Sequence, residues 1–307
     1  MLAVERLSVS IGDAVVLSDV SFGVAAGEAV GIVGESGSGK SMAALAVMRL
    51  LPAAARPSGG IAFDGDDLLA MDDGALNRIR GARIGMVFQE PMTALNPLRR
   101  AVDHVSEPLR LHDGHGRRAA RDIAAALLAR VGVERAEAYP HQLSGGQRQR
   151  VMIAAALACG PALLIADEPT TALDATVQAQ ILDLLADLQH ERRMALLLIS
   201  HDLGVVGQAT ARLLVMYAGR VVEQGSTAAV FARLAHPYTR GLFAASPHAV
   251  RDGRLSPMPG QAPDPRAMPA GCVFAPRCLR AHDDCRSQAP RLEGSAEHQV
   301  ACWHPWS

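Results

Sequence analysis

The chain has 307 residues, and its 30 basic side chains are balanced by 31 acidic ones, which gives a formal net charge of −1. This balance excludes the strongly basic surface expected of a dedicated nucleic-acid-binding protein. The longest apolar stretch, residues 151–166, is interrupted by Gly160 and Pro161 and is shorter than the roughly 20 residues of a membrane-spanning helix. The start of the chain shows no secretory signal, so we expect a protein of the cytoplasm that does not span a bilayer.

The first half of the chain predicts a strand pair, followed by a strand, a glycine-rich loop and a helix. Hydrophobic residues alternate on both sides of a break at Gly12, and Pro52 stops the helix that follows the loop. The predicted segments are strands over residues 2–10, 14–24, 29–33 and 84–88, and a helix from Lys40 to about residue 51.

The second half predicts buried strands that alternate with helices. Such continuously apolar strands are typical of a parallel sheet covered on both faces, which indicates an α/β fold. Near Ala235 the composition changes to Pro, Gly, Arg and Ser, so we expect one domain over residues 1–235 and a C-terminal region over residues 236–307. The predicted segments of this half are helices over residues 147–158 and 175–191, and strands over residues 162–166 and 194–200.

The glycine-rich segment matches the P-loop pattern in the context of a preceding strand and a following helix. Its residues are Gly34, Glu35, Ser36, Gly37, Ser38, Gly39, Lys40 and Ser41. The backbone N–H groups of such a loop and the start of its helix surround the phosphates of a nucleotide. Lys40 is the only lysine of the chain. Its compact ammonium is suited to the β and γ phosphates, and the Ser41 hydroxyl is suited to Mg2+.

Two further motifs follow the P-loop along the chain. Leu-Ser-Gly-Gly-Gln at residues 143–147 opens a helix, and Asp167-Glu168 ends an apolar strand. Together with the P-loop, these motifs resemble those of ATP-binding cassette (ABC) proteins over about residues 1–235. The resemblance implies a P-loop ABC nucleotide-binding domain with a mixed sheet core, a helical subdomain at about residues 90–160, and hydrolysis of ATP with Mg2+.

The resemblance also implies a role for each matching residue. Glu168 would orient and deprotonate the attacking water, a general-base contribution worth roughly 10² to 10⁴ in rate. His201 would meet the γ-phosphate, and Gln89 would touch both magnesium and the water. The magnesium ligands would be Ser41, Gln89 and Asp167. The ATP contacts would come from the P-loop and Met42, and, across a head-to-tail dimer, from Ser144, Gly145, Gly146, Gln147 and Asp174 of the second cassette.

One position departs from the family pattern. Members place an aromatic ring in the first strand pair, where it stacks on adenine, and the matching position here is Ile11 or a close neighbour. Ile11 offers apolar contact without a π face. This predicts weaker adenine binding or another side chain in the same place.

Segments outside the cassette motifs resemble the ATPase subunits of oligopeptide and dipeptide importers, a group that includes nickel and glutathione systems. These segments are residues 89–97, 236–239 and 244–247. The resemblance implies import of peptides or related small solutes through two separate membrane permease subunits. It also implies a second similar or identical ATPase, an extracytoplasmic solute-binding protein and no nucleic acid. The subunit would lie on the cytoplasmic face of the inner or plasma membrane as a peripheral protein.

Four of the five cysteines lie in the C-terminal region, at Cys272, Cys278, Cys285 and Cys302. Disulfides are disfavoured in the cytoplasm, and the close cysteine pairs of most zinc sites are missing. Four thiolates suit a 4Fe-4S cluster, and the resemblance to peptide importers favours this cluster over Zn2+. The histidines close enough in sequence to be alternative ligands are His282, His298 and His304.

Other ATPases with these motifs remain as alternatives. Chromosome and repair members need a very long insertion between the P-loop and Leu-Ser-Gly-Gly-Gln, whereas only about a hundred residues separate Lys40 from Ser144. Translation members carry two cassettes in one chain, whereas this sequence contains a single copy of the motifs. A zinc-held or binding-only regulatory subunit is a further alternative, although every hydrolytic position is filled. We therefore expect an importer ATPase, whose solute is selected by other subunits.

Overall fold

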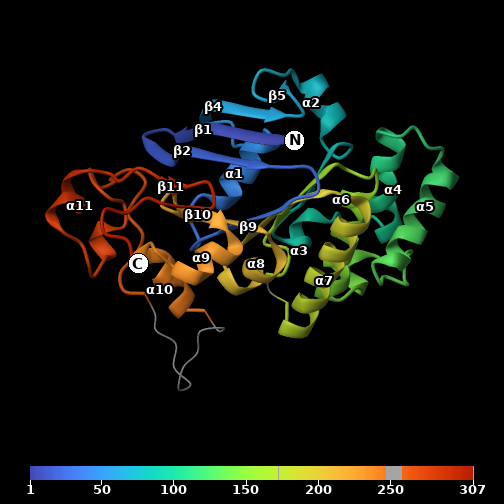
Figure 1. Cartoon of the computed structure of the whole chain (residues 1–307). Coiled ribbons are helices and arrows are strands. Elements are labelled where there is room, and N and C mark those ends of the chain that lie inside the picture. The colour runs from blue at the N-terminus through green and yellow to red at the C-terminus, as the bar shows by residue number, and fades with distance from the viewer. Residues whose placement is uncertain (172, 247–257, 307) are drawn as a thin grey trace. The chain divides into compact units, whose positions relative to one another are not determined.

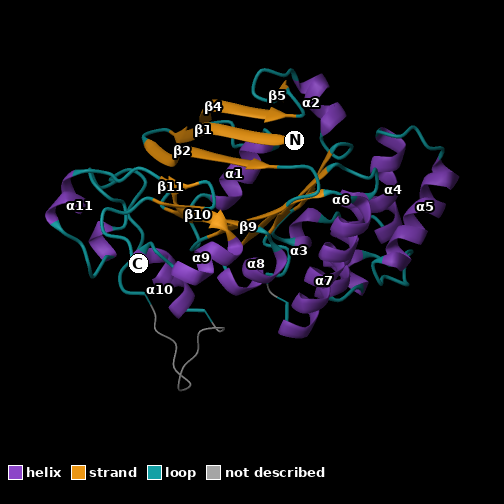
Figure 2. Cartoon of the chain, in the orientation of Figure 1, coloured by secondary structure: helices purple, strands orange, loops and turns teal. Residues whose placement is uncertain are grey.

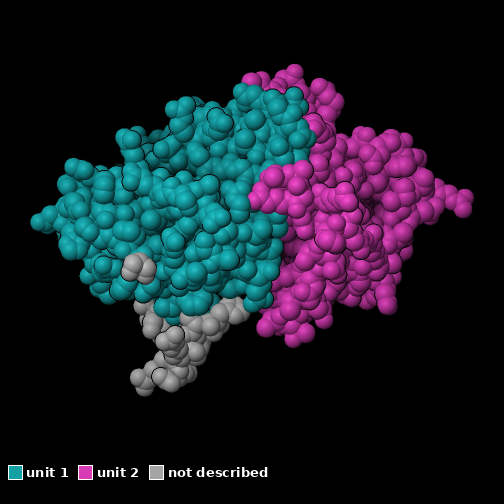
Figure 3. Space-filling view, in the orientation of Figure 1, with its two compact units in different colours: residues 1–24, 29–69, 198–307 teal, residues 25–28, 70–197 magenta. Residues whose placement is uncertain are grey.

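The computed structural model describes residues 1–171, 173–246 and 258–306, so Pro247, the last residue of the importer-like segment 244–247, lies outside the described residues. The chain divides into two compact units (Figure 3). Unit 1 holds residues 1–24, 29–69 and 198–307, and unit 2 holds residues 25–28 and 70–197. The P-loop and the C-terminal region therefore belong to unit 1.

Unit 1 begins with an antiparallel sheet in the strand order β2-β1-β4-β5 (Figure 2). Side chains of β1 alternate between buried and exposed positions, as expected for a sheet with one covered face. The alternation shifts at Arg6, which has a φ of +47° and lies where the pairing of β1 with β2 is irregular. The strands are β1 (Leu2–Ile11), β2 (Ala14–Val24), β4 (Ala55–Phe63) and β5 (Asp66–Asp67).

A second, mixed sheet carries the P-loop at the end of β3. In unit 1, β3 runs parallel to β9, and β9, β10, β12 and β11 follow one another in antiparallel pairs. This arrangement confirms the predicted α/β fold with a mixed sheet. The strands are β3 (Ala29–Val33), β9 (Arg212–Tyr217), β10 (Arg220–Ser226), β11 (Glu293–Ser295) and β12 (His298–Val300).

An aromatic core in unit 1 joins this sheet to the C-terminal region. The rings of Tyr217, Tyr238 and Phe274 are buried and lie 4.6 to 5.5 Å apart between centroids. Because these rings come from β9, α10 and the segment before η3, the C-terminal region shares a core with the sheet. The helices of unit 1 are α1 (Lys40–Val47), α8 (Leu203–Ala209), α9 (Thr227–Arg233), α10 (Pro237–Ala244), η3 (Ala275–Arg277) and α11 (Asp283–Ser287).

Unit 2 contains the helices α2 to α7, which Figure 1 labels, and two parallel strands, β6 and β7. β8 (Ala195–Ser200) begins in unit 2 and ends in unit 1. The other elements of unit 2 are α2 (Asp73–Ile79), β6 (Ile84–Val87), α3 (Pro91–Ala94), α4 (Ala101–Leu111), α5 (Arg117–Arg130), η1 (Pro140–Gln142), α6 (Gly145–Leu157), β7 (Leu163–Asp167) and α7 (Ala175–Arg192).

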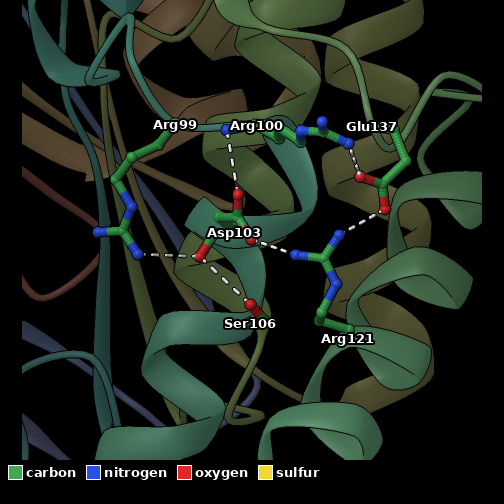
Figure 4. Close-up of polar contacts among 6 residues, drawn as sticks. All are labelled: Arg99, Arg100, Asp103, Ser106, Arg121 and Glu137. Atoms are coloured by element: carbon green, nitrogen blue, oxygen red, sulfur yellow. Dashed lines mark hydrogen bonds and ion pairs between the residues drawn. The ribbon is translucent and has the colours of Figure 1, made fainter.

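Charged side chains connect α4, α5 and the loop that follows α5 (Figure 4). The Asp103 carboxylate accepts hydrogen bonds from the Arg100 N–H and from the Arg121 guanidinium. Arg100 and Arg121 both donate to Glu137 at 2.6 Å, and these bonds lower the pKa of the Glu137 carboxyl. Water screens exposed pairs of this kind, so they contribute little to stability. Their main role is to link α4, α5 and the loop that follows α5.

Several element ends differ from the sequence-based expectation by a few residues. The helix after the P-loop ends at Val47, because Met48 caps it and Arg49 takes a left-handed conformation with a φ of +48°. The helix of the Leu-Ser-Gly-Gly-Gln motif starts at Gly145 instead of residue 147, because Ser144 caps it. None of the helices described in unit 1 or unit 2 is long and apolar enough to cross a bilayer. The domain boundary near Ala235 stays a prediction.

Candidate functional site

Two glycines allow the P-loop to leave β3 and enter α1. A Cβ atom on Gly34 would lie 2.2 Å from the carbonyl oxygen of Met216 in β9, so a side chain cannot fit there. Gly39 has a φ of +99°, a conformation that favours glycine, at the N-cap position of α1. The first turn of α1 contains no acidic residue, so the positive end of the helix is available to an anion.

Lys40 is the first residue of α1 and is only 4% exposed. Its Nζ donates hydrogen bonds to the carbonyl oxygens of Gly34 at 2.7 Å and Glu35 at 2.9 Å. The ammonium of the only lysine in the chain therefore lies inside the curve of the P-loop. Of the other predicted nucleotide contacts here, Ser36 and Gly37 are exposed, Ser38 is buried, and Ser41 and Met42 are half-buried.

In unit 2, Asp167 and Glu168 follow one another at the end of β7 and are both buried. Glu168 has a φ of +46°, which is uncommon for a residue with a side chain and is found preferentially at functional sites. Its Oε2 accepts hydrogen bonds from Thr171 Oγ1 at 2.7 Å and Gln89 Nε2 at 3.3 Å. The structure thus brings together two predicted catalytic residues, Gln89 and Glu168, and adds Thr171, which the sequence analysis did not single out.

The predicted dimer-contact residues of unit 2 lie at helix starts. Ser144 and Gln147 form a reciprocal cap of α6, with N–H···O distances of 3.3 and 3.0 Å. Ser144 and Gly145 are exposed, whereas Gly146 and Gln147 are half-buried. The first turn of α6 contains no acidic residue, so its N–H groups can face a phosphate outside unit 2. Asp174 is exposed and caps α7.

The remaining predicted ATP contacts, His201 and Ile11, lie in unit 1. His201 is exposed and follows β8 directly, ahead of Asp202, which caps α8. Ile11 is half-buried at the end of β1, where it pairs with Ala14 of β2 and Ala55 of β4. The Ile11 side chain is therefore partly accessible at one edge of the first sheet.

The four cysteines of the C-terminal region line one cavity in unit 1. Burial raises the pKa of the Cys302 thiol to about 11 and also raises the pKa of Cys272, with the neighbouring cysteines as a further cause. No three of the four sulfur atoms lie within 4.8 Å of one another. Among the residues that the structure describes, the one compact group of three potential ligands is Asp284, Cys285 and His304.

The three histidines near these cysteines lie in different surroundings. His298 Nε2 lies 2.8 Å from an oxygen of the fully buried Glu223 carboxylate. Glu223 also accepts the backbone N–H groups of Ala235 and His236 at 2.9 Å, so His298 supports the fold. His304 contacts Asp284 at 2.8 Å, and its ring centroid lies 4.3 Å from that of His282.

Two residues of the C-terminal region contact the P-loop, which the sequence analysis did not foresee. The Arg277 guanidinium donates two hydrogen bonds to the Glu35 carboxylate, and the Tyr238 hydroxyl accepts one from the Glu35 N–H. Arg277 is 242 residues from Glu35 in the chain. No local spacing pattern connects residues so far apart, so a single sequence holds no signal for this pair.

Comparisons with known proteins agree with the motifs. Residues 17–171 match the family model of the ABC transporter, and residues 222–285 match that of the oligopeptide/dipeptide transporter, C-terminal region. The chain is 45% identical over 316 residues to the dipeptide transport ATP-binding protein DppD of Escherichia coli, covering 99% of this chain and 97% of that protein. The protein of the same name from Haemophilus influenzae is 44% identical over 315 residues, covering 99% and 96%.

A solved structure supports the same fold. A dimeric ATP-binding cassette in a post-hydrolysis state, bound to ADP and Pi, matches with a TM-score of 0.67 and 32% sequence identity. The match covers 74% of this chain and 99% of that one. It thus extends over a whole cassette and leaves about a quarter of this chain without a counterpart.

Proposed function

The chain belongs to the ABC transporter family as an ATP-hydrolysing subunit, and from this premise we propose that it energises the import of peptides or related small solutes. The observation that carries the proposal is similarity to a dipeptide transport ATP-binding protein along nearly the full length of both chains. This similarity includes the C-terminal region typical of oligopeptide and dipeptide transporters. A cassette of another type would match over the ATP-binding part alone.

We propose that unit 1 supplies the phosphate contacts. The P-loop N–H groups and the start of α1 would surround the phosphates, and Lys40 would exchange the carbonyls of Gly34 and Glu35 for phosphate oxygens. Support comes from the buried Lys40 ammonium, held by the carbonyls of Gly34 and Glu35, and from the absence of acidic residues in the first turn of α1. Met42 would contact the nucleotide beside Ser41, His201 would meet the γ-phosphate, and Ile11 would contact adenine.

We propose that unit 2 supplies the hydrolytic residues. The Glu168 carboxylate would accept a proton from water as the water oxygen attacks the γ-phosphorus and the bond to the bridging β–γ oxygen breaks, releasing ADP and phosphate; the Gln89 amide would orient that water. The hydrogen bond between Gln89 and Glu168 supports this pairing. Hydroxyl, amide and carboxylate oxygens suit a hard cation, so Ser41, Gln89 and Asp167 would hold Mg2+, which neutralises phosphate charge when bound.

The subunit works with membrane permease subunits and with a second ATPase subunit. We propose that Ser144, Gly145, Gly146, Gln147 and Asp174 act on ATP held by that second cassette. The exposed, capped start of α6 supports this role. We further propose two permease subunits, an extracytoplasmic solute-binding protein that delivers the solute, and a peripheral position on the cytoplasmic face of the membrane.

We also propose that the four cysteines hold a 4Fe-4S cluster. Support comes from the convergence of all four on one cavity. Four sulfurs on one tetrahedral Zn2+ would lie about 3.8 Å apart, given Zn–S distances of about 2.3 Å. No three of the four sulfurs lie within 4.8 Å of one another, so they do not form so compact a set. When bound, such a cluster crosslinks its four ligands and thereby orders the segment that carries them.

Co-purification tests the importer proposal. The tagged full-length chain, extracted from its own membranes with detergent, should recover two permease subunits and a second ATPase. In the purified complex, ATP hydrolysis should rise when the solute-binding protein is loaded with dipeptide, and a disaccharide should have no effect. Recovery with ribosomes or DNA, and without membrane proteins, would contradict the proposal.

Metal analysis tests the cluster. Protein prepared without oxygen should be brown, with about four irons and four sulfides per chain. Cys285→Ser should remove the colour and make the chain after about residue 270 sensitive to protease, while Cys159→Ser, which changes the one cysteine of unit 2, should keep the colour. Colourless protein with one zinc would replace the cluster by a zinc site. Metal-free protein with a protease-resistant C-terminal region would exclude both.

A further inference from the structure

The Arg277 side chain connects the cysteine-bearing segment to the P-loop within unit 1. Arg277 immediately precedes Cys278, and its side chain is 5% exposed. Its Nη1 and Nη2 atoms donate to the two oxygens of the Glu35 carboxylate at 2.8 and 3.1 Å, in the paired geometry that makes arginine–carboxylate contacts strong. Its Nε donates to the Pro259 carbonyl at 2.8 Å, and Nη1 lies 3.4 Å from the Tyr217 hydroxyl. The guanidinium is thus fixed on several sides.

Glu35 is held at its backbone as well as its carboxylate. Its N–H donates to the Tyr238 hydroxyl at 2.8 Å, and its carbonyl oxygen accepts from Lys40 Nζ at 2.9 Å. One residue of the P-loop therefore contacts two residues of the C-terminal region and the sole lysine. Arg277 also lies against the aromatic core, with its guanidinium carbon 5.6 Å from the centroid of the Tyr217 ring.

The charge of Glu35 gives this contact a chemical consequence. A carboxylate in a loop that surrounds phosphates repels the nucleotide, and the repulsion is strong where water is partly excluded. Glu35 is 30% exposed, so water screens it incompletely. A guanidinium bonded to both carboxylate oxygens cancels most of this negative charge and holds the Glu35 side chain in one orientation.

We propose that Arg277 is a positioning residue for ATP binding, which neutralises the Glu35 carboxylate and fixes the first turn of the P-loop. This proposal rests on the proposed function, because it assumes that ATP binds at the P-loop. It makes the C-terminal region part of the nucleotide site. Because Arg277 lies between Cys272 and Cys278, disorder in the cysteine-bearing segment would release Glu35 and weaken ATP binding.

The test is equilibrium binding of a fluorescent ATP analogue with Mg2+ to the full-length chain. Arg277→Met should weaken binding about tenfold, because it leaves a charged carboxylate unpaired in the loop. Arg277→Lys, which keeps the charge and loses the paired geometry, should bind with intermediate affinity. The double variant Glu35→Gln/Arg277→Met should bind ATP more tightly than Arg277→Met alone, because the unpaired charge is gone. Arg286→Met, at an exposed arginine of α11, is the matched control and should bind normally.

The double variant separates charge neutralisation from simple support of the fold. If Arg277 only holds the segment in place, Glu35→Gln will not restore affinity, and the proposal is wrong. Normal affinity of a folded Arg277→Met, checked by thermal unfolding, would also overturn it. If Arg277→Met does not fold, ATP binding by Arg277→Lys serves as the test. Weakened binding by Arg277→Lys supports the proposal, and normal binding contradicts it. Failure of the unaltered chain to bind ATP would contradict the proposed function instead.

Discussion

In the proposed mechanism the two units carry different parts of the ATP chemistry, and they do so by different means. In unit 1 the P-loop depends largely on its backbone, with Gly34 and Gly39 where side chains cannot fit and two carbonyl oxygens on Lys40, and the Arg277–Glu35 pair adds to this support. In unit 2 Glu168 depends on side chains, since Gln89 and Thr171 hold its carboxylate. The difference suggests that changes in unit 1 alter ATP affinity, whereas changes in unit 2 alter the rate of hydrolysis.

The largest expected effect is that of Glu168→Gln on the rate of ATP hydrolysis. Glu168→Gln keeps the shape of the side chain but cannot accept a proton, so hydrolysis should fall by roughly 10² to 10⁴ while ATP affinity stays within a few-fold of normal. The measurements are the ATPase rate of the assembled complex and nucleotide affinity. Asp187→Asn, at an exposed carboxylate of α7, should change neither. Near-normal hydrolysis by Glu168→Gln would remove Glu168 from its catalytic role.

Lys40→Ala should have the second-largest effect, and it should act on affinity. Losing a charged donor to the phosphates costs about 1.5–3 kcal/mol, so binding should weaken roughly 10- to 100-fold. Lys40→Arg should also bind weakly, because the planar guanidinium does not fit between the carbonyls of Gly34 and Glu35. Titration with a fluorescent ATP analogue measures both variants. Normal affinity in Lys40→Ala would break the assignment of phosphate binding to unit 1.

Buried His236, in the C-terminal region, should make the stability of the folded protein depend on pH. Burial lowers the pKa of His236 to about 3, from an ordinary value near 6.5. Between these values the unfolded chain binds a proton that the folded chain does not, so stability is full above about pH 6.5. Between about pH 6.5 and pH 3 it should fall by about 1.4 kcal/mol for each pH unit, and it should change no further below pH 3 through this group.

His236→Asn tests this dependence through the slope of stability against pH. His236 Nδ1 accepts a hydrogen bond from the Tyr238 N–H at 3.0 Å, and the Asn carbonyl oxygen can also accept one. Denaturant unfolding between pH 4 and pH 6.5 should therefore show a shallower slope in His236→Asn, even if that variant is less stable at pH 7. The exposed His115→Asn of unit 2 should keep the original slope. Equal slopes in all three proteins would exclude His236 as the cause.

The same comparison shows why some of the site could be predicted from sequence. The P-loop was recognisable because its chemistry depends on closely spaced residues whose types are dictated by local backbone geometry, as at Gly39. The pairing of β1 with β2 was predictable for a similar reason, since a short turn joins two alternating segments. The Arg277–Glu35 pair and the Glu223–His298 pair were not predictable, because each joins residues that only the packed core of unit 1 brings together.

The smallest expected effect is that of Ile11→Tyr, a change at the proposed adenine contact, on ATP affinity. It tests whether changes in unit 1 act on affinity alone. Ile11 is half-buried at the end of β1, so a Tyr there can place its ring on the same edge of the sheet and its hydroxyl in water. Ring stacking is worth roughly 0.5–1.5 kcal/mol, so Ile11→Tyr should tighten ATP binding by up to about tenfold and leave the maximal hydrolysis rate unchanged. Val15→Tyr, at a neighbouring position that is 41% exposed, is the matched control and should bind ATP normally. A gain at Val15 without one at Ile11 would move the adenine contact to β2, and a change in maximal rate from either variant would show that unit 1 influences more than affinity.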